Sequence, residues 1–290
     1  MDDILSDVPH PFDADTAVVS YGPGRYGATV TDRWALLGPD GGFANGGYAL
    51  AICLQAIAAQ SPHPHPVAVS ATYLSPVRFG AAEVLVETVR IGRRFSVAAA
   101  RLVQHDTERV RVVATFGDLA ALSGRTEVRN RPPALPPPEE CLGIATREQV
   151  PGFTLADRVE FRYVELPGWR TGAPAGRLTD EFWMRFAPDA GGARRDADAV
   201  ALAAMVDMAT PPVIDLGEHG STTLELSVHV RGLPASGWLA CRASTRHVID
   251  GLHDEDFEIW DATGRLVAQS RQLALLPSPR TGGATEPAHS

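Results

Sequence analysis

The sequence predicts an α+β protein in which two antiparallel sheets are each wrapped around a long apolar helix. One pattern occurs twice in the same order, over about residues 45–118 and 196–276: an apolar helix, a Pro-rich break and four strand-like runs. A second observation is that the helices are apolar on almost every face, so that each must be covered on all sides. A repeated unit of this kind indicates two half-molecules that share one core. Identity between the halves is slight, which is typical of an old duplication.

The composition is that of a globular domain and argues against nucleic acid as a partner. The chain has 290 residues, of which 44% are hydrophobic and 21% charged, with a formal net charge of -9. Binding to phosphates requires clustered Lys and Arg, which an acidic chain does not supply overall. A polyanionic ligand would need a local patch such as Arg90, Arg93 and Arg94, although solvated arginines in a hairpin turn are the favoured explanation of this cluster.

The cysteines and the N-terminus predict a cytoplasmic protein with no membrane partner. Cys53, Cys141 and Cys241 are odd in number and widely spaced, as expected of buried thiols in a reducing compartment. The acidic start of the chain lacks the apolar segment of a secretory signal. No apolar stretch approaches the ~20 residues needed to cross a bilayer.

The first half begins with two strand-like segments, at 14–19 and 27–31. Asn45 then provides a good N-cap for a helix that runs to about Gln60 and ends at Ser61-Pro62. Four runs with strand composition and short polar turns follow, at 66–77, 82–91, 95–104 and 109–118.

The second half repeats this order after a Pro-rich segment. Asp196 or Asp198 can cap the apolar helix VALAAMVDM, which Thr210-Pro211-Pro212 ends. Four further strand-like runs lie at 223–231, 238–247, 254–260 and 265–276. We therefore expect an N-terminal repeat over 1–120, a linker over 121–150, a C-terminal repeat over 151–277 and a flexible tail over 278–290.

Two side chains of the second half are candidates for chemistry on physical grounds alone. Asp207 lies near the C-terminal end of an apolar helix, where burial and the helix dipole both disfavour its charge, so we expect a raised pKa. Gln272 shares the inward face of the last strand with Ala268 and Ala274, and a buried amide requires partners. It could bind the carboxylate or the attacking water, or be a satisfied core glutamine.

Thr223 is a third candidate, but simple strand geometry points it away from the core. Leu226 and Val228 form the apolar face of its strand, and strict alternation aims Thr223 the other way. A place beside Asp207 would require a bulge at the strand start, and Thr222 competes for the same role.

An antiparallel sheet around a long apolar helix is the hot-dog architecture, so that two copies make a double hot dog. The sequence resembles the acyl-CoA thioesterase II family, whose members carry two fused hot-dog repeats. The similar segments are GGFANGGYALA and the Leu-Ser-Pro of ATYLSPV in the first half, and VDMATPP, STTLELSVHVRG, ASGWL and IWDATGRLVAQSRQLALL in the second. Together they cover about residues 34–276.

This resemblance implies an enzyme of lipid metabolism that hydrolyses acyl-CoA to free fatty acid and CoA without a cofactor or metal. The family carries an Asp, a Thr or Ser, and a Gln that orient the nucleophilic water, and these correspond to Asp207, Thr223 and Gln272. Hot-dog thioesterases pair such an acid with a helix N-terminus of the other repeat, which implies that Gly47 or Tyr48 donates an N–H to the thioester oxygen. Glycines at this point could instead serve close helix packing.

Two other functions and an oligomer remain open at this point. The first helix has no interior acid, so we expect one active site per chain. An enoyl-thioester hydratase or dehydratase would need a His near Asp207, and none is close in sequence. A non-catalytic acyl-thioester binding module is the other alternative. Exposed hot-dog sheets commonly pair, which favours a homodimer or a higher homo-oligomer.

Overall fold

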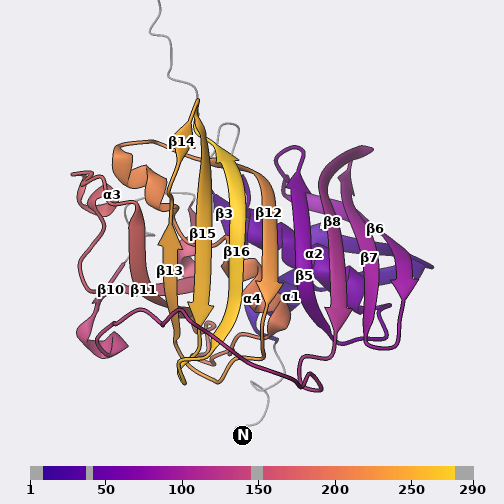
Figure 1. Ribbon diagram of the computed structural model, residues 1–290. Helices are drawn as coiled ribbons and strands as arrows, with labels where there is room; N and C mark the ends of the chain where they lie inside the picture. The colour runs from indigo at the N-terminus through magenta and orange to yellow at the C-terminus, as the bar shows by residue number, and fades with distance from the viewer. Residues whose placement is uncertain (1–8, 37–41, 145–152, 278–290) are drawn as a thin grey trace, which may run out of the picture.

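The computed structural model describes residues 9–36, 42–144 and 153–277 and contains one large antiparallel sheet (Figure 1). The sheet has 14 strands in the order β1-β2-β6-β7-β8-β5-β12-β16-β15-β13-β11-β10-β9, with β14 paired to β15. The two halves of the chain meet where β5 pairs with β12, for example at Ala71 and Leu226. The expected tail over 278–290 lies outside the described residues.

The N-terminal half supplies six of these strands and two helices. The strands are β1 (Val19–Gly22), β2 (Arg25–Val30), β5 (His65–Tyr73), β6 (Gly80–Ile91), β7 (Phe95–Gln104) and β8 (Thr107–Gly117). The helices are α1 (Pro11–Thr16) and α2 (Gly46–Ala58), and a separate two-stranded ladder joins β3 (Ala35–Leu36) to β4 (Phe43–Ala44). The expected strand at 14–19 is wrong for most of its length, because Pro11 starts a helix that His10 caps by accepting a bond from Phe12.

The C-terminal half supplies the other eight strands and two short helices. The strands are β9 (Leu142–Gly143), β10 (Val159–Tyr163), β11 (Thr179–Phe186), β12 (Thr222–Val230), β13 (Leu239–Ser244), β14 (Val248–Ile249), β15 (Leu252–Trp260) and β16 (Leu266–Leu275). The helices are α3 (Gly168–Thr171) and α4 (Ala199–Met205). Asp198 rather than Asp196 caps α4, since its side chain accepts the Ala201 N–H.

The duplication that the sequence predicts is visible in the strand order. In each half the buried helix, α2 or α4, is followed by a long strand, β5 or β12, which lies at the centre of the sheet beside the last strand of its own half. The order β6-β7-β8-β5 in one half is mirrored by β12-β16-β15-β13 in the other. Antiparallel pairing of β5 with β12 satisfies two edges that separate sheets would leave open.

Two features differ from the expected architecture. The two predicted sheets are joined into one, and the second helix has only seven residues, so that among the described residues a long helix is present in the first half alone. Both helices are nevertheless buried: all seven residues of α4 and ten of the thirteen residues of α2 are inaccessible. The helices lie on one side of the sheet and pack against each other (Figure 1).

The segment between the halves crosses the outer face of the C-terminal half (Figure 1). Asn130 Nδ2 donates to Glu258 Oε1 at 2.6 Å, and Trp183 Nε1 donates to the carbonyl oxygen of Pro136 at 2.8 Å. Contacts of this kind attach the segment to the sheet. The last residues of the expected linker, 145–150, lie outside the described residues, and the proposed domain boundaries stay a prediction.

No helix in the described part of the chain combines the length and apolar character that crossing a bilayer would require.

Candidate active site

The candidate site lies where the N-terminus of α2 crosses the C-terminal end of α4. Each helix comes from a different half of the chain, and their backbones approach closely at Gly47. A Cβ atom at Gly47 would lie 2.1 Å from the carbonyl oxygen of Ala204. The glycine is therefore required for this crossing, as the packing interpretation of the sequence held.

Asp207 follows directly after α4 and turns its carboxylate toward the start of α2. Gly47 N donates to Asp207 Oδ2 at 2.7 Å, and the side-chain amide of Asn45 donates to the carbonyl oxygen of Asp207 at 2.7 Å. Asn45 also caps α2 by accepting the Tyr48 N–H at 3.0 Å. One side chain thus fixes both the helix start and the position of the acid.

Burial raises the pKa of Asp207 from its ordinary value to about 7. The hydrogen bond from the Gly47 N–H and the nearby Thr223 hydroxyl lower this pKa, but less than burial raises it. A carboxyl group with a pKa near neutrality can accept and return a proton at physiological pH.

Thr223 and Gln272 meet beside this carboxylate. Thr223 Oγ1 donates to Gln272 Oε1 at 2.8 Å, and Gln272 is buried on the inward face of β16. The pairing of β12 with β16 shifts register between Thr223 and Glu225, which is the bulge that an inward Thr223 requires. Thr222 is exposed, so that Thr223 is the threonine that faces the site.

The two backbone amides predicted to bind the thioester oxygen are placed differently. Gly47 N faces the site and donates to Asp207, whereas Tyr48 N is engaged by Asn45. The side chain of Tyr48 is fully buried and its hydroxyl donates to the carbonyl oxygen of Asp15, away from Asp207. Of this pair, only Gly47 remains a candidate oxyanion donor.

Two further polar side chains border the site and were not among the sequence candidates. The hydroxyl of Tyr73, at the end of β5, is buried without a hydrogen-bond partner in the described structure, and burial and the charge of Asp207 raise its pKa. Glu255 on β15 is buried directly opposite Gln272. Glu255 could have been found from the alternation along LHDEDFEIW, because it shares a strand face with Phe257 and Ile259.

The other polar features of the sequence lie outside this site. Arg93 belongs to the β6–β7 hairpin, whose backbone contacts His63 beyond the C-terminal end of α2. That hairpin is a helix length of ~20 Å from Gly47. A hollow of about 870 Å³ over β1, β2 and β6 is lined by Asp15 and Arg33, which pair with each other.

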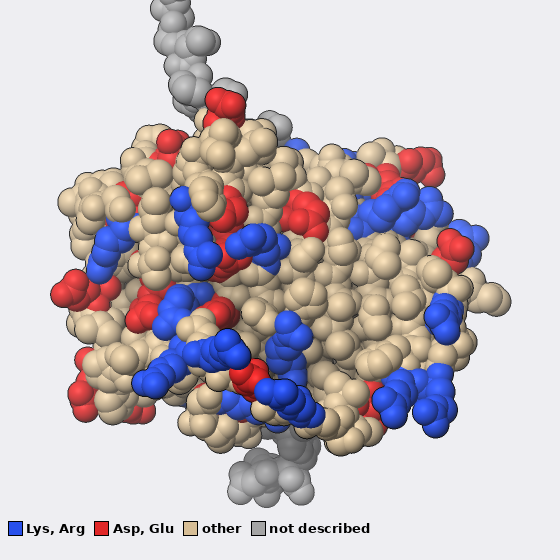
Figure 2. Space-filling model, viewed as in Figure 1, with Lys and Arg blue, Asp and Glu red and all other residues tan. Residues whose placement is uncertain are grey.

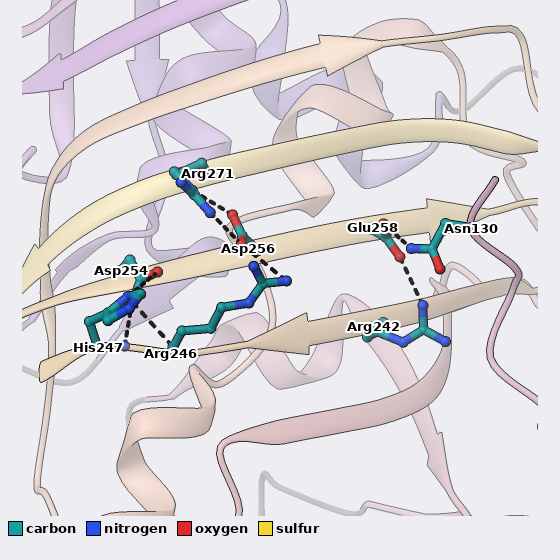
Figure 3. A network of polar contacts seen from close by, with 8 residues as sticks. All are labelled: Asn130, Arg242, Arg246, His247, Asp254, Asp256, Glu258 and Arg271. Atoms are coloured by element: carbon teal, nitrogen blue, oxygen red, sulfur yellow. Dashed lines mark hydrogen bonds and ion pairs between the residues drawn. The ribbon is translucent and has the colours of Figure 1, made fainter. Parts of the chain in front are cut away.

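The charges of β13, β15 and β16 form a network on the opposite, outward face of the sheet (Figure 3). Arg271 binds Asp256 through two hydrogen bonds of 2.6 Å, and Arg242 Nη1 donates to Glu258 at 2.9 Å. These pairs are partly solvated and alternate along β15 with the buried Glu255. The same strand thus carries ordinary surface ion pairs on one face and an acid at the site on the other.

Comparison with known proteins identifies both halves. Family models described as the acyl-CoA thioesterase N-terminal and C-terminal domains match residues 32–117 and 138–276. The crystal structure of a protein assigned as thioesterase II from Thermobifida fusca is 29% identical, with a TM-score of 0.81 over 91% of this chain and 98% of that one. A protein of unknown function with a hot dog fold from Alicyclobacillus acidocaldarius is 22% identical, with a TM-score of 0.80 over 94% of this chain and 100% of that one.

Relatives without an assigned function are also similar. An uncharacterised protein of Mycobacterium tuberculosis is 28% identical, with 86% of this chain and 90% of that protein covered. The two family matches fall on the two halves that share the sheet, and the folds of the solved structures agree with them. The chain belongs to the acyl-CoA thioesterase family and is a thioester hydrolase.

Proposed function

We propose that the chain hydrolyses acyl-CoA with a water molecule that Asp207 activates. Thr223 and Gln272 position this water molecule relative to the Asp207 carboxylate. The observation that carries this proposal is the juxtaposition of a partly buried carboxylate with a Thr–Gln pair near the start of α2. Positioned proton transfer by such a group contributes typically ~10²- to 10⁴-fold to a rate.

The proton and electron balance of the reaction is simple. Asp207 takes a proton from water as the water oxygen bonds to the thioester carbonyl carbon. The negative charge then moves to the carbonyl oxygen, where the Gly47 N–H is the candidate donor. The C–S bond breaks next, and the thiolate of CoA takes the proton from Asp207, which leaves a free fatty acid and CoA.

The Gly47 N–H has a double role in this scheme. It donates to Asp207 Oδ2 in the structure and would turn to the thioester oxygen when substrate is bound. Loss of this bond raises the proton affinity of Asp207, since the bond lowers the pKa of the group. Substrate binding would therefore make Asp207 a stronger base.

Substitution of Asp207 by Asn tests the proposal. We expect Asp207→Asn to lower turnover by about 10²- to 10⁴-fold and to leave the fold intact, because Asn keeps the shape and removes the base. The measurement is release of free thiol from a panel of acyl-CoAs, with circular dichroism as the fold check. Asp118→Asn, which changes an acid outside the site, serves as the control. Wild-type turnover in Asp207→Asn would falsify the assignment.

We also infer a homo-oligomer that forms through the outer face of the N-terminal half. Figure 2 shows charges spread over the C-terminal half and an area with fewer charges over the middle of the N-terminal half, although Glu108 and the exposed Arg111 lie at one end of β8. Ser70, Thr72 and the exposed Val113 lie in this area. Depletion of charged residues is typical of the core of a protein–protein interface. Light scattering of the purified protein should give at least twice the chain mass of 30.9 kDa, and a monomer at all concentrations would contradict the inference.

The compartment stays a proposal as well. Cys53, Cys141 and Cys241 are free and buried, as expected in the reducing cytoplasm that the sequence predicts. Fractionation of cells that express the tagged chain would test it, and recovery outside the cytoplasmic fraction would contradict it.

A further inference from the structure

Glu255 is a buried acid next to the catalytic candidates, with no role in the scheme above. It pairs across the sheet with Gln272, and the exposed fractions of the two residues are 3% and 6%. Its Oε2 atom has no hydrogen-bond partner in the described structure. An acid is rarely buried without a matching partner, because removing a carboxylate from water costs several kcal/mol.

The side chain of Gln272 connects this acid to the rest of the site. Gln272 Oε1 accepts the Thr223 hydroxyl, which leaves the NH₂ end of the same amide for another partner. Hydrogen bonding with Gln272 lowers the pKa of Glu255, as expected when an amide N–H donates to a carboxyl oxygen. The amide thus lies between the Thr223 hydroxyl and the Glu255 carboxyl.

We propose that Glu255 is a positioning residue of the thioesterase site. Its carboxyl group accepts the Gln272 N–H and thereby holds Gln272 Oε1 toward Thr223. The site works only while Glu255 is protonated. An amide side chain can flip by 180°, since its oxygen and nitrogen ends have the same shape. In the flipped state the NH₂ group would face the Thr223 hydroxyl, and Gln272 would no longer accept the proton of that hydroxyl. The inference rests on the proposed function, because it assigns the orientation of a residue used there.

The charges around Glu255 explain why the protonated state matters. Burial and then the charge of Asp207 raise the pKa of Glu255 to about 8, and Asp180 and Asp256 add to this effect. His253, the neighbouring inward residue of β15, has a lowered pKa through burial and supplies no positive charge near neutral pH. Ionisation of Glu255 would place a second negative charge beside Asp207 and oppose the oxyanion of the transition state.

The orientation is tested by a double-mutant cycle between positions 255 and 272. We expect Glu255→Met, which removes the acceptor at similar length, to lower kcat by about 10-fold with little change in KM, and Glu255→Gln to restore most of the rate. In a Gln272→Ala background, Glu255→Met should cause no further loss. Glu258→Gln, on the outward face of the same strand, is the matched control and should keep the wild-type rate.

The pH profile separates positioning from a structural role. The wild-type rate should rise as Asp207 loses its proton and fall again as Glu255 ionises, whereas Glu255→Gln should keep the rise and lack the alkaline fall. An unchanged kcat in Glu255→Met, losses that add fully with Gln272→Ala, or an alkaline fall that persists in Glu255→Gln would each overturn the proposal. If Glu255→Met does not fold, Glu255→Ala takes its place in the cycle. If neither variant folds, the pH profile of Glu255→Gln alone tests the proposal.

The two proposals can fail separately. A normal rate in Asp207→Asn with coupling between 255 and 272 would remove the general base and keep the positioning pair. An inactive Asp207→Asn without that coupling would remove Glu255 alone.

Discussion

Asp207 lies where burial disfavours the ionised form of its carboxyl group. The residue follows the last turn of a buried helix, and its carboxylate accepts the backbone N–H of Gly47, with the Thr223 hydroxyl close by. A structural carboxylate of this burial would usually have a cationic partner. Burial raises its pKa to about 7, where a base is most effective at neutral pH.

Thr223 and Thr222 form a matched pair for testing the bulge in β12. Thr223 donates to Gln272, whereas Thr222 is exposed. We expect Thr223→Val to lower kcat/KM by about 10- to 100-fold, because valine has the same shape and lacks the hydroxyl. Thr222→Val should leave the rate unchanged. Equal losses in the two variants, measured by thiol release, would mean that neither hydroxyl has the proposed role.

Sequence reasoning selected Asp207 and Gln272 as candidates by different signals, and it did not select Glu255. An acid within an apolar helix and an amide on an apolar strand face are both visible as exceptions to a pattern. Glu255 lies within Asp254-Glu255-Asp256, where a run of acids is typical of a solvated face. Only the alternation of the whole strand shows that its middle member points inward.

At the scale of elements, the site depends on the crossing of α2 and α4. The start of α2 brings the free amide of Gly47 to Asp207, and the end of α4 brings Asp207 to that amide. Because the two helices come from different halves of the chain, neither half contains the site alone. The cap of α2 could be read from Asn45 and its end from Ser61-Pro62, and the cap of α4 was narrowed to Asp196 or Asp198. The crossing could not be predicted, since periodicity gives the faces of a helix and not its neighbours.

Gly47→Ala tests how closely this crossing is packed. An added Cβ would lie 2.1 Å from the backbone of Ala204, and backbone atoms cannot move aside as a flexible side chain can. We expect a loss of about 1–3 kcal/mol in the free energy of unfolding, and a parallel loss of activity. The control is Gly220→Ala, where no atom lies within 4 Å of the new Cβ. Denaturant unfolding measures the stability of each variant. Equal stability of Gly47→Ala and Gly220→Ala would contradict the packing role of Gly47.

At the scale of the molecule, the sequence predicted the contents of each half better than their joining. Runs of alternating residues define strands and the face that each strand buries, and the repeated order defines the two halves. Pairing between β5 and β12 depends on backbone groups at two strand edges, which carry no sequence pattern of their own. The seven-residue length of α4 was not predicted either, because apolar residues continue beyond the helix into the turn that contains Asp207.

The buried acids should make the whole molecule less stable as pH rises. The pKa of Asp207 is about 7 in the folded chain against an ordinary value of 3.8, so the folded state binds the proton more tightly than the unfolded state. Stability from this group is therefore fully present below about pH 4 and is lost as pH rises through about 7.

Asp207→Asn removes this dependence. Relative to wild type, we expect the variant to gain little at about pH 4 and to be more stable by about 1–3 kcal/mol at about pH 9, because the wild-type chain must then bury a charge that Asn lacks. Paired denaturation curves at the two pH values measure the difference. A gain in stability in the same variant that loses turnover would show that the fold carries Asp207 at a cost for the sake of its chemistry. A constant difference between the two proteins at both pH values would instead mean that the proton affinity of Asp207 is the same in the folded and unfolded chains.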